Sequence, residues 1–407
     1  MQKITLPERP DWRKEAQDLG FTFADMGGEP YWDETSAYRL TMQQIEEDIE
    51  APSTELHALC REAVAKAVLS EEWLTRLEIP RPHWDLVEQS WANGEPELYG
   101  RMDLAYDGNG PAKLLEYNAD TPTSLYESAS FQWLWLEEQQ KRGVLSPDTD
   151  QFNALHEALV DRWGQICEPA AEIHFAADQS NPEDYATVEA LAWAAREAGM
   201  GAHFTDLAGI GVTEEGQFAD DKDRIIGTLF KLYPWEDMLR DDFAVYLQGS
   251  GMRCIEPAWK AILSNKGILP LLWEMFPGHP NLLPAFFESD VAEALKGVAP
   301  AAAVAAAFAA AEDQLRAGHV TKPIFSREGA GVSIHRHGAV TERTPDDSYS
   351  HHPMILQALA PLPEYSGFHP VLGAWIVGET CVGLGIREDR SHITHNLSRF
   401  KPHFIEG

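Results

Sequence analysis

Four polar residues alternate along two segments of the sequence that predict a β-hairpin: Arg101, Asp103, Glu116 and Asn118. The segments flank Asp107-Gly-Asn-Gly110, a run of strong turn formers. A loop of two or four residues centred there would set Arg101 opposite Glu116. Because side chains alternate between the two faces of a strand, the four polar residues would then converge on one face. A loop of three or five residues would break this convergence.

The polar face of the predicted hairpin carries two carboxylates and an amide oxygen, without cysteine or histidine. Such hard oxygen ligands suit Mg²⁺. An arginine beside them is placed to stabilise the charge of a phosphoryl group in transfer. An exposed hairpin with ordinary surface charges is the alternative, and the hairpin alone does not decide between them. The opposite face is apolar and is expected to meet the core through Met102, Leu104, Leu115 and Tyr117.

Two lysines lie in apolar surroundings, where a charge without an anionic partner is costly. Lys266 precedes Gly-Ile-Leu-Pro-Leu-Leu-Trp273, and Lys322 lies between Val320 and Phe325. Phosphate is a natural partner, and the following loop with Gly329 could close over phosphates with backbone N–H groups. For each lysine the alternative is a side chain that buries its stem and keeps its ammonium group in water.

The elements that must position these groups are mixed helices and strands, which favours an α/β or α+β fold. Apolar spacing predicts helices at residues 56–77, 134–142, 152–167, 187–199 and 291–315, the last of which contains the alanine-rich stretch 300–311. Strands are expected at 225–232, 320–325 and 332–334, with a hairpin formed by 371–377 and 380–386 around Gly378-Glu379.

Composition limits the classes of function. The chain has 407 residues and is 44% hydrophobic, enough for two or three packed lobes, and it has no apolar run of membrane-spanning length. Its formal net charge of −33 argues against nucleic acid as a partner. The acidity fits either a solvated surface or attraction of a cationic substrate such as a polyamine. Four widely spaced cysteines and an N-terminus without an apolar signal core favour the cytoplasm.

Several motifs, taken in their order along the chain, resemble the synthetase domain of the glutathionylspermidine synthase family. The resemblance runs from about residue 10 to the C-terminus and implies an ATP-grasp fold with a preceding pre-ATP-grasp lobe and a lid. It implies one catalytic unit over residues 1–407, divided roughly into a substrate- and metal-binding core (10–255), a lid region (256–330) and a C-terminal ATP-grasp core (331–407). Its most specific motifs are Gly100-Arg-Met-Asp103, Glu116-Tyr-Asn-Ala-Asp120, Ile255-Glu-Pro, Ser264-Asn-Lys266, Lys322-Pro-Ile, Arg327-Glu-Gly329 and Gly383-Leu-Gly-Ile-Arg387.

The resemblance also implies roles for the candidate residues. Mg²⁺ would be held by Asp103, Glu116 and Asn118, and Arg101 would be catalytic by stabilising the transition state. ATP would be bound by Arg101, Asp103, Lys266, Lys322, Gly329, Gln357 and Leu359. The substrates would be bound by Thr121, Glu183, Asp184 and Arg387, the last gripping the carboxylate of the acid. The implied reaction is attack of that carboxylate on the γ-phosphate of ATP, followed by displacement of phosphate by an amine.

The sequence departs from the glutathione-using members of this family. Leu232 and Asp237 stand where those members have threonines, and Thr121 stands where they have serine. The glutathione site is therefore expected to be altered. Glu183 and Asp184 correspond to the acidic pair of the family, which would bind an ammonium group of the substrate. Amidase activity is not predicted, because the synthetase part accounts for the 407 residues.

Three classes of function remain open at this point. The acid–amine ligase uses every group of candidate residues at once. A magnesium-dependent phosphohydrolase would use the carboxylates but would not need Lys266 or Lys322. An ATP-binding protein without synthetase activity would bind ATP at the same site but would form no product from an acid and an amine. Histidines gather near the end of the chain, but no HExxH pattern is present, so a zinc site is not predicted.

Overall fold

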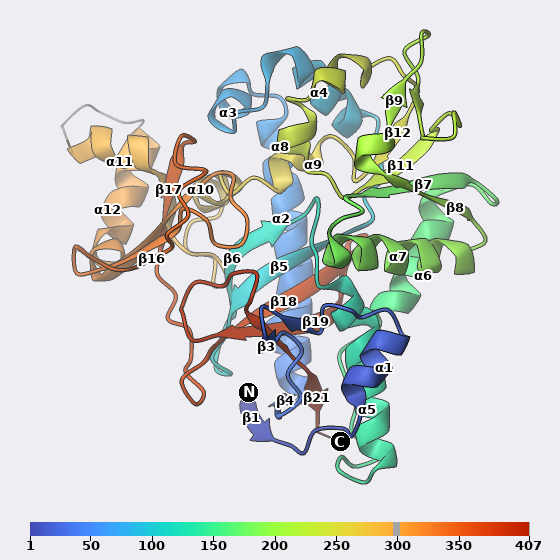
Figure 1. Cartoon of the computed structure of the whole chain (residues 1–407). Coiled ribbons are helices and arrows are strands. Elements are labelled where there is room, and N and C mark those ends of the chain that lie inside the picture. Colours follow the sequence, from blue (N-terminus) through green and yellow to red (C-terminus); the bar gives the residue numbers. More distant parts are fainter. Residues whose placement is uncertain (296–301, 407) are drawn as a thin grey trace.

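Helices and strands are mixed along residues 1–295 and 302–406, which the computed structural model describes, and the expected α/β character is confirmed (Figure 1). The three largest sheets have four or five strands. Two of them are antiparallel and one is parallel. The predicted site residues are distributed over strands, loops and helix ends of all three layers, so the way these sheets meet determines the site.

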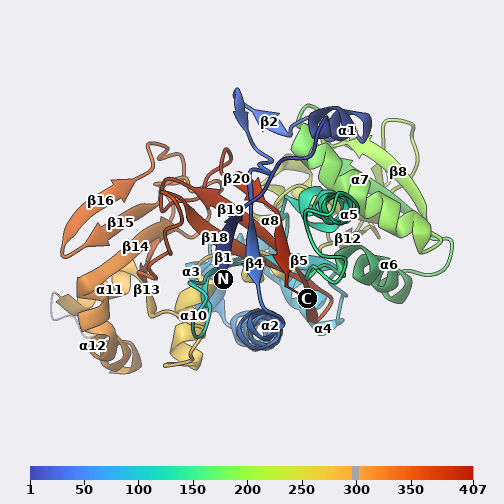
Figure 2. The same ribbon diagram turned by 90° about the horizontal axis from the view of Figure 1, so that it is seen from below.

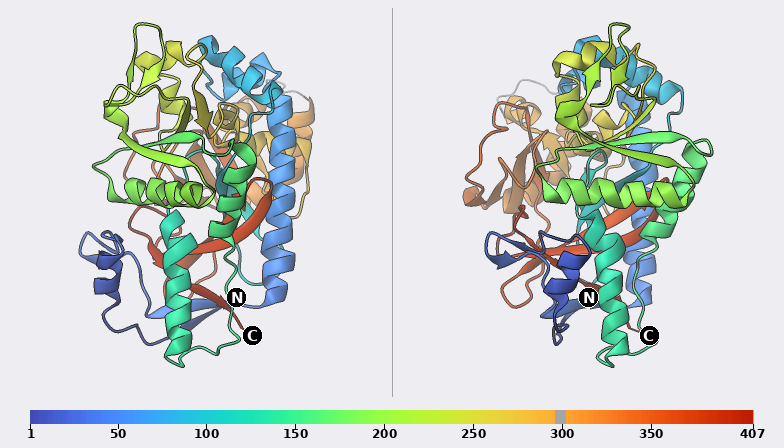
Figure 3. Two further views of the ribbon diagram at one scale, coloured as in Figure 1. Left: turned by 90° about the vertical axis from the view of Figure 1, so that its right-hand side faces the viewer. Right: turned by 45° about the vertical axis from the view of Figure 1, so that its right-hand side comes forward.

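The first antiparallel sheet has the strand order β20-β19-β18-β5-β6. Its hydrogen bonds join segments from opposite ends of the chain, because β18 pairs with β5 on one side and with β19 on the other. The long helix α2 (Ala51–Ala67) packs on one face of this sheet, where its apolar residues share a core with Met102 and Leu104 (Figures 2 and 3). The strands are β5 (Tyr99–Ala105), β6 (Lys113–Asn118), β18 (His369–Val377), β19 (Thr380–Asp389) and β20 (Arg399–Lys401).

The hairpin expected around Gly378-Glu379 is confirmed. Val377 pairs with Thr380, so Gly378 and Glu379 form a two-residue loop between the strands. Gly378 has a φ of +58°, a left-handed conformation that glycine adopts without strain. This tight connection fixes the register of β18 against β19 and places Arg387 on the strand next to the middle of the sheet.

The second antiparallel sheet has the order β13-β17-β14-β15-β16, and helices α11 (Glu288–Leu295) and α12 (Ala302–Ala317) pack against it (Figure 2). Residues 296–301 of the predicted helix 291–315, and the beginning of the alanine-rich stretch, lie outside the described residues. A boundary at residue 330 would fall between β14 and β15, which are paired, so we take residues 285–358 together as one layer. The strands are β13 (Ala285–Phe287), β14 (Gly318–Pro323), β15 (Ser333–Arg336), β16 (Ala339–Arg343) and β17 (Met354–Ala358).

The parallel sheet has the order β12-β11-β7-β8 and packs with helices α6 (Leu155–Ile166) and α7 (Pro182–Glu197) (Figure 3). Helix α7 begins earlier than the predicted 187, because the side chain of Asn181 caps it by accepting hydrogen bonds from the N–H groups of Glu183 and Asp184. This cap holds both acidic residues in the first turn of α7. The strands are β7 (Glu172–Ala177), β8 (Gly201–Asp206), β11 (Thr228–Lys231) and β12 (Arg253–Ile255).

Both ends of the chain enter one small sheet, in which β4 (Ser36–Leu40) lies between β1 (Gln2–Thr5) and β21 (His403–Ile405) (Figure 1). Helices α1 (Trp12–Asp18) and α5 (Gln132–Lys141) contribute to an aromatic core beside it. The predicted helical stretch 56–77 is divided, because Ser70 caps a new helix. The other α-helices of the described residues are α3 (Glu71–Arg76), α4 (Trp84–Ala92), α8 (Trp235–Met238), α9 (Lys260–Leu263) and α10 (Ile268–Met275).

Candidate active site

The β5–β6 hairpin carries the polar face as predicted, but with a different register. Arg101 lies opposite Asn118 and Asp103 lies opposite Glu116, so the expected pairing of Arg101 with Glu116 was wrong by two residues. The loop 106–112 has an odd number of residues, and this alone would have turned the polar side chains apart. A bulge at Leu115, between the pairs Asp103–Glu116 and Leu104–Leu114, adds one residue and restores the shared face.

The bulge also turns Leu115 toward the cavity, and Leu114 is buried in the core in its place. The prediction that Leu115 faces the core was therefore wrong. Strand β6 is an edge strand, and side chains from the second sheet bond to its bulged carbonyls. Lys322 Nζ donates to the oxygen of Leu115 at 2.7 Å, and Gln357 Nε2 donates to the oxygen of Leu114 at 3.0 Å. The bulge therefore connects the first sheet to the second at the centre of the site.

A single cavity of about 330 Å³ lies where the two antiparallel sheets and the start of α7 meet. Every residue that the sequence singled out as a site residue lines this cavity. They are Arg101, Asp103, Glu116, Asn118, Thr121, Glu183, Asp184, Lys266, Lys322, Gly329, Gln357, Leu359 and Arg387. The cavity also has wall residues that sequence reasoning did not select, among them Tyr31, Asp120, Glu236 and His392.

Two arginines share the buried carboxylate of Asp103. Arg101 donates from Nε to Oδ1 at 2.7 Å and from Nη2 to Oδ2 at 3.2 Å, and Arg387 donates to Oδ2 at 3.3 Å. The remaining terminal nitrogen of Arg101 donates to the carbonyl oxygen of Thr123 at 2.7 Å. These bonds fix the guanidinium of Arg101 in one orientation beside the carboxylates, which is the condition for electrostatic catalysis without reorganisation.

Two lysines approach the second carboxylate from the neighbouring elements. Lys266 Nζ lies 3.2 Å from Glu116 Oε2 and donates to the carbonyl oxygen of Ser326 at 2.8 Å. Burial raises the pKa of Glu116, but the ammonium groups of Lys266 and Lys322 outweigh burial and hold that pKa well below its usual range. Burial lowers the pKa of Lys322 to about 8, although Glu116 opposes this change. Four cationic side chains thus face two carboxylates, and the surplus positive charge favours a polyphosphate.

The donor set of Asp103, Glu116 and Asn118 fits Mg²⁺. All three supply oxygen, and Mg²⁺ needs only one or two carboxylates because it keeps waters and shares substrate phosphates. Asn118 Nδ2 donates to Glu116 Oε1 at 3.4 Å, which turns the amide oxygen away from Glu116 and leaves it available. Among the residues that the structure describes, no group of three histidine, cysteine, aspartate or glutamate side chains forms a metal cluster.

The glycine loop after β14 closes one side of the cavity. Gly329 has a φ of +75°, and a Cβ atom there would lie 2.8 Å from both Ile393 Cγ2 and the carbonyl oxygen of Thr394. Only glycine therefore allows this loop to pack on the segment after β19. On the same loop, Arg327 donates to Oγ1 of Thr121 at 3.3 Å, a contact that brings the loop to the end of β6.

The acidic end of the cavity is formed by Glu183 and Asp184 in the first turn of α7, together with Glu236. Burial and the neighbouring Glu183 raise the pKa of Asp184 to about 6. Leu232 and Asp237, which stand in place of the family's threonines, are not among the described residues that line the cavity. Leu232 is buried in the core of the parallel sheet, so this part of the wall is formed by Glu236 instead.

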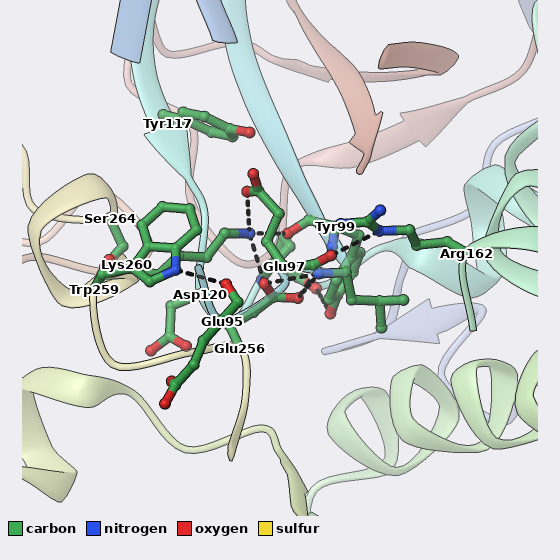
Figure 4. Close-up of polar contacts among 12 residues, drawn as sticks. Glu95, Glu97, Tyr99, Tyr117, Asp120, Arg162, Glu256, Trp259, Lys260 and Ser264 are labelled. Atoms are coloured by element: carbon green, nitrogen blue, oxygen red, sulfur yellow. Dashed lines mark hydrogen bonds and ion pairs between the residues drawn. The ribbon is translucent and has the colours of Figure 1, made fainter. Parts of the chain in front are cut away.

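Behind the cavity, a fully buried lysine joins strand β5 to helix α9 (Figure 4). Lys260 Nζ lies 2.7 Å from Glu256 Oε2 and 3.2 Å from Glu97 Oε2, and it donates to the carbonyl oxygen of Tyr99 at 2.7 Å. Glu256 in turn accepts from the N–H of Tyr99 at 3.0 Å. Because β5 continues to Arg101 and α9 leads to Lys266, this network fixes the two phosphate-facing segments relative to each other.

Replacing Lys260 by methionine is expected to lower the free energy of unfolding by about 3–5 kcal/mol, because two buried carboxylates lose their common partner. Urea denaturation followed by fluorescence would measure the loss. Lys66→Met is the matched control: its ion pair with Glu274 is partly exposed, and its removal should cost no more than about 1 kcal/mol. Equal losses in the two variants would contradict a structural role for the buried network.

The two sheets that enclose this cavity, with a parallel-sheet lobe beside them, define an ATP-grasp fold with a preceding pre-ATP-grasp lobe. The chain belongs to the glutathionylspermidine synthase preATP-grasp family, whose model matches residues 3–406. A solved glutathione synthetase-like effector from Globodera pallida has a similar fold, with a TM-score of 0.55, 11% identity and coverage of 98% of both chains.

Curated relatives of this chain carry the names of synthetases and ligases. A Haemophilus influenzae protein provisionally named an acid–amine ligase is 35% identical over the full length of both chains. Trypanothione synthetase from Crithidia fasciculata is 28% identical over 84% of this chain and 53% of its own length. The bifunctional glutathionylspermidine synthetase/amidase of Escherichia coli is 24% identical over 96% of this chain and 63% of its own length. The chain thus spans 53% of the first of these two synthetases and 63% of the second.

Among the described residues, no helix is long and apolar enough to cross a membrane.

Proposed function

We propose that this protein is an ATP- and magnesium-dependent ligase that joins a carboxylate to an amine through an acyl phosphate. One observation carries the proposal: two antiparallel sheets and the connection between α9 and α10 bring two carboxylates, two arginines and two lysines together around one cavity whose other end is acidic. A polyphosphate suits the cationic end, and an ammonium group suits the acidic end. The names of the relatives, which are an acid–amine ligase, a trypanothione synthetase and a glutathionylspermidine synthetase, support the same class of reaction.

In this proposal each part of the cavity has one task. Lys266 and Lys322 bind the phosphates of ATP, with Gly329 closing over them and Gln357 and Leu359 facing the adenine. Asp103, Glu116 and Asn118 would hold Mg²⁺, which when bound neutralises phosphate charge. Arg387 orients the carboxylate of the acid toward the γ-phosphate. Arg101 stabilises the charge that develops on the phosphoryl group, and positioning supplies most of the remaining acceleration.

The second half of the reaction takes place at the acidic end. Glu183 and Asp184 attract the ammonium form of the amine, and Thr121 lines the same cavity. A polyamine-like substrate fits this end and the net charge of −33, since several cationic groups would be attracted by the same surface. The three-part division at 10–255, 256–330 and 331–407, with the lid at 256–330, stays a prediction. A cytoplasmic location is part of the proposal, because all four cysteines are free and buried.

Mass spectrometry of products tests this function. The protein is incubated with MgATP and a metabolite extract, and the expected product has the mass of an acid plus an amine minus water, formed with ADP and phosphate. ADP release that needs neither acid nor amine would instead support an ATPase without synthetase activity. Turnover of phosphate esters without ATP would support a phosphohydrolase. Either of these outcomes, without a coupled product, would overturn the ligase proposal.

A further inference from the structure

Strand β16 forms the outer edge of the second antiparallel sheet, and its one residue that is not exposed is a glutamate (Figure 2). The other four residues, Ala339, Val340, Thr341 and Arg343, are exposed, whereas the side chain of Glu342 is 29% exposed. A carboxylate that is covered in this way needs hydrogen-bond partners. The proposed chemistry gives Glu342 no task, so its partners indicate what it does.

Both oxygens of this carboxylate accept hydrogen bonds from one short segment that follows β19. The backbone N–H of His392 donates to Oε1 at 3.1 Å, and the hydroxyl of Ser391 donates to the same oxygen. The Nδ1 atom of His392 donates to Oε2 at 3.0 Å, because a carboxylate can only accept. Residues 391 and 392 lie between β19 and β20 of the first antiparallel sheet, so Glu342 joins the far edge of the second sheet to the first.

Thr344, which follows β16 and lies two positions after Glu342, holds the glycine loop. Its Oγ1 atom donates to the carbonyl oxygen of Gly329 at 2.8 Å. The loop also packs against the segment that Glu342 holds, since a Cβ atom at Gly329 would lie 2.8 Å from Ile393 Cγ2. Glu342 and Thr344 therefore hold two segments that are in contact with each other.

These two segments form one side of the cavity that the proposed function assigns to ATP. Gly329, His392 and Ile393 all line this cavity. Ile393 belongs to a buried apolar cluster with Ile334, and Leu359 packs against that cluster. Because Leu359 is proposed to face the adenine, the contacts of Glu342 enclose the cavity beside the nucleoside part of ATP.

The two antiparallel sheets are thus joined by an inner and an outer set of contacts, which differ in burial. The inner contacts come from Lys322 and Gln357, which donate to the bulged carbonyls of β6 and are 5% and 2% exposed. The outer contact joins Glu342 to His392, whose side chains are 29% and 33% exposed. Water competes for partly exposed charged contacts, so they contribute little to stability. The outer contact is therefore the one that can open when ATP enters and ADP leaves.

A closed cavity protects the acyl phosphate of the proposed reaction from water. Water that reached this intermediate would add its oxygen to the acyl carbon while the bond from that carbon to the phosphate oxygen breaks. The carboxylate would be restored, both protons of the water would leave with dihydrogen phosphate, and ATP would be consumed without an amide. We propose that Glu342 is a positioning residue that latches the second sheet over the bound nucleotide and excludes water until the amine has reacted. This inference rests on the proposed ligase function and adds the group that keeps its cavity closed.

The release of a fluorescent nucleotide tests the latch directly. Glu342→Gln keeps the size of the side chain but removes its charge and one acceptor oxygen. The dissociation rate of mant-ADP, measured by stopped-flow fluorescence after mixing with excess ATP, should rise by about tenfold, the scale of a hydrogen bond to a charged group. Glu364→Gln is the matched control, because Glu364 is exposed and is not among the described residues that line the cavity. Equal release rates in Glu342→Gln and the wild type would overturn the proposal.

A second variant tests whether the effect passes through the segment after β19. Ser391→Ala removes one donor to the Glu342 carboxylate and should also accelerate the release of mant-ADP. The double variant should release mant-ADP no more than about twofold faster than Glu342→Gln alone, because both substitutions break one contact. Arg343→Gln, at an exposed position of the same strand, should leave the rate unchanged. Effects of Glu342→Gln and Ser391→Ala that multiply would contradict a shared latch.

The ratio of ADP to amide is a readout that a purely structural role would not change. With the acid and amine found by mass spectrometry, the wild type should form ADP and amide in equal amounts. In Glu342→Gln the ratio should rise by about twofold or more, because water enters the open cavity and hydrolyses the acyl phosphate. A ratio equal to that of the wild type would overturn the exclusion of water by Glu342.

Failure of the ligase function has a different signature from failure of the latch. If the wild type forms no amide with any pair of substrates, the ligase function fails, but the release rates of mant-ADP still decide whether Glu342 holds the cavity closed. If the wild type does not bind mant-ADP, the cavity is not a nucleotide site, and both proposals are overturned.

Discussion

Arg101→Ala is expected to lower kcat by about 10³-fold or more, the scale on which arginines act when they meet a transferring phosphoryl group. Arg101 is held by Asp103 and by the carbonyl oxygen of Thr123, so its guanidinium needs no rearrangement when charge develops. The KM for ATP should change much less, because Lys266 and Lys322 remain. Steady-state ADP release over a range of ATP concentrations separates the two constants.

The fold should tolerate this change, since Asp103 keeps Arg387 as a partner at 3.3 Å. Arg13→Ala is a suitable control, because Arg13 pairs with Asp25 where both side chains are about half exposed. Arg101→Lys keeps the charge but loses the two-point contact with Asp103, and it should recover only part of the activity. An increase in KM with unchanged kcat would assign Arg101 to substrate binding alone.

Asp103→Asn is expected to abolish magnesium-dependent ATP turnover. The substitution keeps the volume of the side chain but removes a candidate metal ligand's charge, and it leaves Arg101 and Arg387 without their common anion. Metal ions contribute several kcal/mol of transition-state stabilisation, so turnover should fall by at least about 10²-fold at any Mg²⁺ concentration. Turnover measured against Mg²⁺ concentration gives the result, with Asn118→Ala as a second test of the donor set.

Asp107→Asn controls for a change of charge on the same hairpin, because Asp107 is exposed in the loop 106–112 and bonds only to the local N–H of Asn109 among the described residues. Its turnover should match the wild type. Normal turnover in both Asp103→Asn and Asn118→Ala would remove these two residues from the metal site, and the metal would then need other ligands.

Local patterns in the sequence predicted those features that depend on neighbouring residues. The turn at Gly378-Glu379 and the polar face of β5 and β6 both follow from period-two alternation and turn chemistry. The register did not follow, because the pairing of two strands depends on the length of the loop 106–112 and on a bulge at Leu115. The odd length of the loop and the bulge each shift the register by one residue. Together they keep Arg101 and Glu116 on one face of the sheet.

Contacts between distant segments could not be predicted from local pattern. Glu97 and Lys260 meet in the core, yet nothing in the sequence around either residue indicates the other. Tyr31 reaches the cavity from the N-terminal region, and its surroundings show no motif. The order of the motifs along the chain did indicate that Glu183 and Arg387 belong to one site, and both line the cavity although they lie in different layers.

The pairing of β18 with β5 has a consequence for how the protein is made. Strand β5 emerges from the ribosome long before its neighbour β18, so one edge of β5 stays open while the segments between them are translated. Such an edge can pair with other chains, and closing so long a loop slows folding. We therefore expect nascent chains to engage chaperones, and products truncated before β18 to aggregate.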